Sequence, residues 1–248
     1  MTDRGFDTLA GEYDAYRTGY SSGLIDAVVG FGAQPGRELL DVGCGTGIAT
    51  AAFCDRDCVM TGIDPSEPML ERARDRVPRA TFVQGRVESL PFANNTFDGS
   101  ICAHAFHWFD AVRAFEELIR VTRPGGPVAT WWKVLSTDEP LRAIRETASE
   151  ELGVGSLGDL LAGGFNAFYA APFGSRALRV LPFVTTVSVE GWVGYERSRR
   201  RALEAYGEAR DRYLQRIEQL LLERYRVPTA TFEVRYVQFL YVGFVPAT

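Results

Sequence analysis

The sequence is short of lysine and cysteine. Among its 27 cationic side chains Lys133 is the one lysine and the rest are arginine, a bias that we attribute to a GC-rich genome rather than to a binding function. The cysteines are Cys44, Cys54, Cys58 and Cys102. Their spacing is neither C-x-x-C nor zinc-like, which argues against a zinc module and predicts reduced thiols in a cytosolic protein. A Cys54–Cys58 link is the alternative.

Long apolar runs are also missing. No uncharged stretch reaches the roughly 18 residues that a membrane-spanning helix needs. Residues 1–7 hold no apolar segment of the kind found in signal peptides. The formal net charge of −5 is unfavourable for a nucleic-acid-binding surface. We therefore expect a cytoplasmic protein that acts on a small-molecule substrate, with neither nucleic acid nor membrane as its partner.

What is present is an ordinary globular composition and one distinctive stretch. A chain of 248 residues with 46% hydrophobic side chains fits one α/β domain with insertions. In residues 38–47, ELLDVGCGTG, an apolar run typical of a buried strand ends in three glycines at alternate positions, and a helical stretch follows. Glycines permit positive φ and close approach by a ligand, and the helix start presents unpaired N–H groups. The stretch predicts a cradle for a small molecule.

Two classes of ligand use such a cradle. Dinucleotide-binding proteins carry G-x-G-x-x-G, whereas the spacing here is G-x-G-x-G and Asp41 precedes the first glycine. A carboxylate at that position would repel a phosphate but would help to orient a ligand with cationic centres. A second predicted strand, 58–64, ends in Asp64. Its distance from the motif is close to the spacing of about 20 residues at which an acidic residue binds a ribose.

The rest of the chain alternates predicted strands and helices. A helix is expected to follow Ser66, its N-cap. Further strands are expected at 80–86, 97–103, 128–134, 178–189 and 231–245, and helices at 21–30, 111–121, 139–152 and 192–225, after a first helix around residues 9–16. Strands that alternate with helices favour a mostly parallel sheet. Residues 135–175 carry no motif.

Four segments resemble, in order and spacing, the class I S-adenosylmethionine-dependent methyltransferases. They are LLDVGCGTG (39–47), GIDPSEPML (62–70), FVQGRVESLPFANNTFDGSICAHAFHWFD (82–110) and RPGG (123–126), and the pattern Phe6, Ala10, Tyr13, Arg17 precedes them. The most similar subgroup includes the trans-aconitate and ubiquinone-pathway methyltransferases. The resemblance implies a doubly wound, mostly parallel seven-stranded sheet of Rossmann-like type with a helical cap. It implies one domain over 1–248, with a helical lid at 1–30 and cap insertions at about 136–175 and 190–226.

The same resemblance implies an S-adenosylmethionine site. The residues expected at this cofactor are Arg17, Asp41, Gly43, Cys44, Gly45, Asp64, Pro65, Met69, Val87, Glu88, Ala103 and His104. In this scheme the glycines approach the aminoacyl end, Asp64 binds the ribose, and Met69 lies against the adenine or, equally well, in the core. Two residues depart from the family: Arg86 where many relatives have Asp, and His104 where close relatives have Gln.

The candidate catalytic residues are His107 and Tyr13. Methyl transfer needs a base only if the acceptor loses a proton during attack. His107 follows the fourth predicted strand, near the reactive centre, and Tyr13 on the lid competes with it. No metal is expected. The alternative function is a methyltransferase-fold cyclase or lyase, which consumes S-adenosylmethionine by intramolecular attack or uses the fold only as a pocket.

A run of arginines, residues 197 and 199–201, has two interpretations. It forms a solvated helix face, or it forms an anion site for an acidic substrate or a carrier-protein arm. A homodimer contact is equally open.

Overall fold

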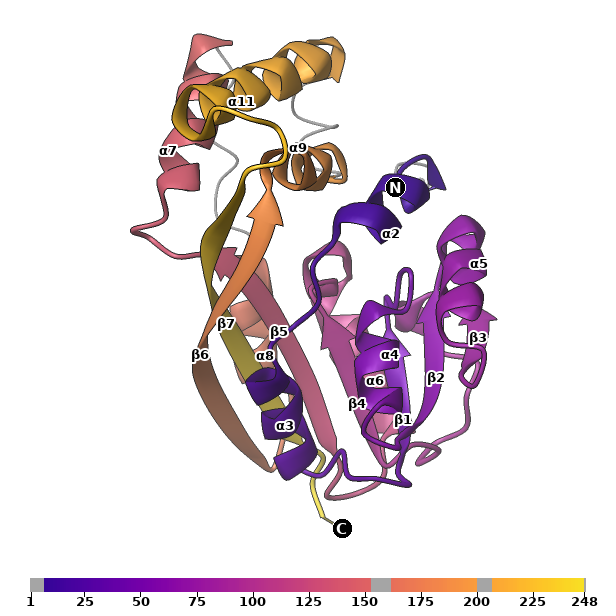
Figure 1. Ribbon diagram of the computed structural model, residues 1–248. Coiled ribbons are helices and arrows are strands. Elements are labelled where there is room, and N and C mark those ends of the chain that lie inside the picture. The colour runs from indigo at the N-terminus through magenta and orange to yellow at the C-terminus, as the bar shows by residue number, and fades with distance from the viewer. Residues whose placement is uncertain (1–6, 153–161, 200–206, 248) are drawn as a thin grey trace.

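The computed structural model describes residues 7–152, 162–199 and 207–247 (Figure 1). Its strands are β1 (Glu38–Val42), β2 (Val59–Asp64), β3 (Thr81–Gln84), β4 (Gly99–Ala103), β5 (Pro127–Leu135), β6 (Ser175–Ser188) and β7 (Thr231–Phe244). They form one seven-stranded sheet in the order β3-β2-β1-β4-β5-β7-β6. β1 to β5 are parallel, and β7 runs antiparallel to both of its neighbours. The prediction of a doubly wound, mostly parallel sheet is confirmed.

The helices lie on both faces of the sheet and above its upper end. They are α2 (Ala10–Tyr16), α3 (Ser22–Gly30), α4 (Ile48–Cys54), α5 (Glu67–Arg76), α6 (Ala111–Val121), α7 (Pro140–Glu151), α8 (Ala162–Ala170), α9 (Val189–Arg197) and α11 (Arg210–Tyr225), with short 3-10 turns η1 (Val87–Ser89), η2 (Phe106–Trp108) and η3 (Gly207–Ala209). In Figure 1, α7, α9 and α11 stand together above β6 and β7, and α2 lies between α9 and α5. We call α7, α9 and α11 the cap.

The long helical stretch expected over 192–225 holds α9 and α11 at its two ends, and residues 200–206 between them lie outside the described residues. One prediction about helices was wrong. No helix was expected at 162–170, yet α8 forms there. Its two glycines lower helix propensity, and contacts of its later turn with α6 override that local preference.

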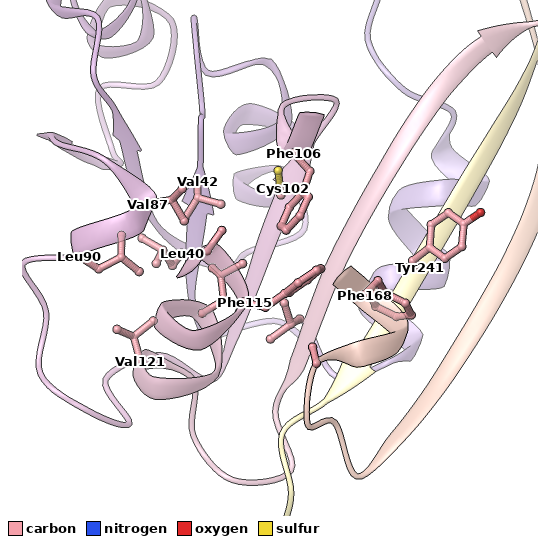
Figure 2. Packing of buried hydrophobic residues seen from close by; sticks show 14 of the residues in the cluster. Leu40, Val42, Val87, Leu90, Cys102, Phe106, Phe115, Val121, Phe168 and Tyr241 are labelled. Carbon is pink, nitrogen blue, oxygen red and sulfur yellow. The ribbon is translucent and has the colours of Figure 1, made fainter. Parts of the chain in front are cut away.

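The strands bury different residues on their two faces because side chains alternate along a strand. On β5, Trp131 packs with α3 and α4 on one face, and Trp132 packs on the other. The second face is built around Phe115 of α6, which contacts Phe168 of α8 and the stacked ring of Phe106 (Figure 2). Phe106 therefore belongs to the core rather than to the wall of a site.

The cap has its own apolar cluster. Trp192, Tyr213, Ile217 and Leu221 are fully buried in it, and Leu135 at the end of β5 and Tyr236 of β7 pack with them. Phe6 of the lid pattern lies outside the described residues. The cap is thus anchored on β5 and β7.

Three local features complete the fold. All four cysteines are buried free thiols, which rules out the Cys54–Cys58 link. Ser66 occupies the N-cap position of α5, but its hydroxyl donates to Asp7 (2.6 Å) instead of capping the helix. Within the described ranges, no helix has the length and apolar character that crossing a membrane requires.

Candidate functional site

Three glycines shape the turn after β1. Gly43, Gly45 and Gly47 have φ angles of +64°, +53° and +76°, a region that other residues seldom adopt. A Cβ at Gly43 would lie 2.7 Å from Ala105, and one at Gly47 would lie 3.2 Å from Ala73. A Cβ at Gly45 would meet nothing within 4 Å. Of the three, Gly45 is therefore the glycine whose exposed side leaves room for a ligand.

Asp41 lies in the buried part of β1, two residues before Gly43. It is fully buried, and its Oδ2 accepts from Thr50 Oγ1 of α4 at 2.6 Å. Its Oδ1 has no hydrogen-bond partner among the described residues. Burial, opposed by the hydrogen bond from Thr50 and assisted by the charge of Asp64, raises the pKa of Asp41 to about 7. A buried carboxylate oxygen without a partner is costly, so this atom suits a cationic hydrogen-bond donor.

Asp64 lies at the carboxyl end of β2, beside the glycine turn. Its Oδ2 accepts from Gly45 N (3.0 Å) and its Oδ1 from Ser66 N (2.9 Å). These two bonds fix the carboxylate in place, and an ionised carboxylate still has capacity to accept more hydrogen bonds. We call Asp41, residues 43–47 and Asp64 the glycine edge.

The other predicted cofactor residues of this half lie around the glycine edge. Cys44 is buried with its sulfur against Gly62 of β2, so its backbone rather than its thiol lines the turn. Pro65 is half-buried beside Asp64, whereas Met69 of α5 is buried, with 2% exposure. Val87 and Glu88 lie in η1, and Glu88 Oε1 accepts from Asp110 N at 3.1 Å, which ties the loop after β3 to the loop after β4. Arg86 is exposed.

Both histidines follow β4 and Ala103. His104 adopts a left-handed φ of +57°, and its Nδ1 accepts from Lys133 N at 3.3 Å. His107 Nδ1 accepts from Trp132 Nε1 at 3.4 Å, and the two imidazole centroids are 5.7 Å apart. Burial, His107 and nearby cations lower the pKa of His104 well below its usual value. In a neutral ring whose Nδ1 accepts, Nε2 carries the proton, so both rings are hydrogen-bond donors at Nε2.

The lid brings Tyr13 and Arg17 close to the glycine edge. The Arg17 guanidinium lies between two rings, 4.6 Å from the Tyr13 centroid and 4.7 Å from that of Tyr195. Its Nε and Nη2 donate to the hydroxyl and carbonyl of Ser198, which leaves its end-on pair of N–H groups for a ligand carboxylate. Burial raises the pKa of Tyr13, to which Asp64 and Asp41 contribute. The phenol therefore keeps its proton at neutral pH.

Two buried polar groups beside the site were missed from the sequence. Lys133 of β5 is buried among aromatic rings, and its Nζ donates to Thr18 and Gly19. Glu196 of α9 is fully buried and accepts from Arg145, from Arg199 (2.7 Å) and from the Tyr213 hydroxyl (3.1 Å). Neither residue is part of a spacing pattern, because one is a lone lysine and the other a single acidic residue in a helix. Their burial could therefore not be predicted from the sequence.

The arginine run fits the first interpretation at Arg197 and neither of the two at Arg199. Arg197 is exposed, as a solvated face requires, whereas Arg199 is half-buried and paired with Glu196. Arg200 and Arg201 lie outside the described residues. Arg199 is thus part of the cap interior.

Comparisons with known proteins find similarity to methyltransferases. Residues 40–130 match the family model described as a methyltransferase domain. The chain is 28% identical over 216 residues to an uncharacterized methyltransferase of Mycobacterium tuberculosis, an alignment that covers 87% of this chain and 85% of that protein. Residues 40–130 are thus similar to methyltransferase domains. The chain is also 33% identical over 165 residues to a malonyl-(acyl-carrier protein) O-methyltransferase of Erwinia pyrifoliae, covering 60% of this chain and 63% of the relative.

Solved structures share the fold of this chain. A protein of Anaeromyxobacter dehalogenans, provisionally named a type II methyltransferase, superposes with a TM-score of 0.74 at 21% identity, over 94% of this chain and 100% of the other. The cyclase SpnF superposes with a TM-score of 0.56 at 21% identity, over 99% and 93% of the two chains. At these identities the likeness concerns the architecture, with the glycine edge at the carboxyl ends of the parallel strands.

Proposed function

We propose that this chain transfers a methyl group from S-adenosylmethionine to a small-molecule acceptor. The observation that carries the proposal is Asp41 Oδ1, a buried carboxylate oxygen without a described partner at the turn where Gly45 leaves room. S-adenosylmethionine has an α-ammonium group that would supply the missing donor. A dinucleotide would instead bring a pyrophosphate toward two carboxylates, which Coulomb repulsion disfavours.

The other residues of the glycine edge fit the same ligand. Asp64 is held by Gly45 N and Ser66 N, and a carboxylate fixed at this place is proposed to accept from the two hydroxyls of a ribose. The end-on N–H pair of Arg17 suits the α-carboxylate. Pro65 is proposed to flank the adenine, and Val87 to give its backbone N–H to the adenine edge, with Glu88 beside it. Because Met69 is buried, its proposed contact with the adenine needs a side-chain movement.

The chemistry asks little of the protein beyond placement. S-adenosylmethionine supplies an activated methyl group, so the chain's task is to align the acceptor and to exclude water, effects that can lower a barrier by roughly 7–11 kcal/mol. His104 and His107 both present a donor at Nε2, which suits them to orient an acceptor oxygen. To act as a general base at Nε2, His107 would have to change its tautomer. To act as a base, Tyr13 would first have to lose its phenol proton, whose pKa is raised.

A second candidate is a cyclase that uses the same fold as a pocket. The observation that favours it is the superposition of SpnF over nearly the whole of both chains. Such a reaction needs no base, in keeping with histidines that donate rather than accept at Nε2. A lyase that consumes S-adenosylmethionine internally is the related form. The malonyl-(acyl-carrier protein) relative supports a carrier-bound acceptor as one form of the methyl-transfer proposal.

One experiment separates these reactions. The purified protein is incubated with S-adenosylmethionine alone, then with candidate acceptors, and the products are identified by mass. Adenosylhomocysteine formed only with an acceptor supports methyl transfer, whereas methylthioadenosine formed without one supports the lyase. A protein that leaves S-adenosylmethionine intact with every acceptor, yet binds it, points to the cyclase.

A further inference from the structure

The one lysine of the chain is buried where the lid meets the sheet. Lys133 lies on β5 with 8% exposure. Its Nζ donates to the Thr18 carbonyl (3.1 Å), to the Thr18 hydroxyl (2.5 Å) and to the Gly19 carbonyl (3.1 Å). Three acceptors use all three protons of an ammonium group. The geometry therefore suits the charged form of Lys133.

Aromatic rings surround the same nitrogen. Nζ lies 5.8 Å from the centroid of Tyr20, 5.4 Å from that of Phe183 and 4.9 Å from that of Tyr236. These rings come from the chain after α2, from β6 and from β7. Ring faces within about 6 Å attract a cation. The charge is held by carbonyls, a hydroxyl and rings, and no salt bridge to Lys133 is found among the described residues.

Neighbouring contacts hold the same piece of chain, residues 17–21, which we call the lid linker. Gln238 of β7 pairs directly with Lys133 across the two strands, and its Oε1 accepts from Ser21 Oγ at 2.5 Å. At the other end of the linker, Arg17 donates to Ser198 at the end of α9. The linker is thus fixed to two adjacent side chains of the sheet and to the cap. Since α2 ends at Tyr16, the linker sets where α2 and its Tyr13 lie.

We propose that Lys133 is a positioning residue that clamps the lid linker to the sheet through its ammonium group and so keeps Tyr13 and Arg17 at the glycine edge. The consequence for ligand binding rests on the proposed function. The clamp itself is a property of the chain without ligand, so the two are tested separately.

The charges around Lys133 make the clamp sensitive to pH. Arg17 and Tyr20 face it from the lid linker, His104 from the loop after β4, and Tyr236 from β7. Burial raises the pKa of both tyrosines and lowers that of His104, so of these four only Arg17 is charged at neutral pH. Burial, followed by Arg17, lowers the pKa of Lys133 to about 7. Lys133 is therefore an ammonium group with three protons to donate below pH 7 and an amine with two above it.

Lysine-specific labelling tests the charge directly. Protein labelled with ¹⁵N only in lysine has one labelled side chain, so a single amine signal reports Lys133. We expect that signal to titrate with a midpoint near pH 7 and to be that of an ammonium group at pH 6. A neutral amine at pH 6 would overturn the proposal.

Limited trypsin digestion tests the clamp, because Arg17–Thr18 is the first peptide bond of the lid linker. At pH 7 we expect Lys133→Met to lose residues 1–17 about ten times faster than wild type, whereas Lys133→Arg, which keeps the charge, stays within about threefold. The thermal midpoint of Lys133→Met is expected to equal or exceed that of wild type, because an apolar side chain replaces a desolvated charge. Equal cleavage rates in wild type and Lys133→Met, or equally fast cleavage in both variants, would contradict the clamp.

Binding of adenosylhomocysteine links the clamp to function. By calorimetry at pH 7, Lys133→Met should bind about tenfold more weakly than wild type, with Lys133→Arg close to wild type. A wild-type protein that binds no adenosylhomocysteine overturns the proposed function, and the trypsin assay then still decides the clamp. Equal affinities with unequal cleavage overturn the link to binding.

Discussion

The glycine edge and the cap each bury one carboxylate completely, and the two carboxylates are in opposite electrostatic states. Asp41 accepts one hydroxyl hydrogen bond, keeps an oxygen without a described partner, and has a pKa raised to about 7. Glu196 accepts from Arg145, Arg199 and Tyr213. Despite its burial, the two guanidinium charges lower its pKa to about 2.

The difference indicates which region is built for a ligand. Glu196 has its countercharges within the chain, so it stabilises the packing of α7, α9 and α11. Asp41 lacks one, so its ionised form is unfavourable until a cation arrives from outside. A buried carboxylate with a raised pKa marks a binding site better than burial alone does.

The largest effect is expected from the cap. Glu196→Gln leaves two guanidinium groups without their countercharge, and breaking a buried ion pair in this way costs about 3–5 kcal/mol of unfolding free energy. Denaturant unfolding measures the loss. Because the folded pKa of Glu196 is lowered, wild type should gain stability from this residue as the pH rises from about 2 to the normal Glu pKa, 4.5, and keep it above that. A variant as stable as wild type would remove the contrast with Asp41.

The next effect concerns Gly45 and has a matched control in Gly36. Both glycines have positive φ, and a Cβ at either would meet nothing within 4 Å. We expect Gly45→Ala and Gly36→Ala each to lose about 1 kcal/mol of stability from the strained backbone. Only Gly45→Ala should lose affinity for adenosylhomocysteine, by about 100-fold, because its methyl group occupies the ligand's space. Calorimetry and thermal unfolding provide the two readouts, and equal affinities in the two variants would contradict the site.

A smaller and opposite pair of effects is expected at Asp41. Asp41→Asn should weaken adenosylhomocysteine binding about tenfold at pH 8, because it removes the charge that pairs with the α-ammonium group. The same variant should be more stable than wild type without ligand at that pH. The folded pKa of Asp41 is raised, so wild type loses stability as the pH rises from about 4 to about 7 and stays lower above it. Unfolding curves at pH 5 and pH 8 for both proteins check the sign.

The smallest expected effect is the release of protons when the ligand binds. If a ligand ammonium pairs with Asp41, the pKa of that carboxyl falls on binding, and protons are released near pH 7. The calorimetric heat for wild type should then depend on the ionisation enthalpy of the buffer. Asp41→Asn should lack that part of the dependence. A buffer dependence that is the same in both proteins would assign the proton to another group.

These two regions also differ in how far the sequence predicts them. The glycine edge lies within residues 38–66, and its strand, turn and acidic residues follow directly from local pattern, so the sheet and the position of Asp41 and Asp64 could be predicted. The clamp joins residues far apart in the chain: Lys133 meets Thr18, and Arg17 meets Ser198, 181 positions away. No periodic pattern predicts such contacts, and the four motifs that carry the resemblance end at residue 126.

Other details depend on tertiary contacts that the local sequence does not contain. The sequence predicts that the Ser66 hydroxyl caps α5, but this hydroxyl donates to Asp7 instead. His107 looked like a base, but its Nδ1 faces Trp132, and that contact depends on the register of β5. The protonation state of such a side chain follows from tertiary contacts that spacing alone does not contain.

The most direct measurement of the central claim is a pair of calorimetric titrations of the wild-type protein at pH 7.5, one with S-adenosylmethionine and one with NAD. We expect saturable binding of S-adenosylmethionine that Gly45→Ala weakens about 100-fold, and no binding of NAD, because Asp41 and Asp64 receive a cation and repel a pyrophosphate. Binding of NAD with no heat from S-adenosylmethionine would contradict it.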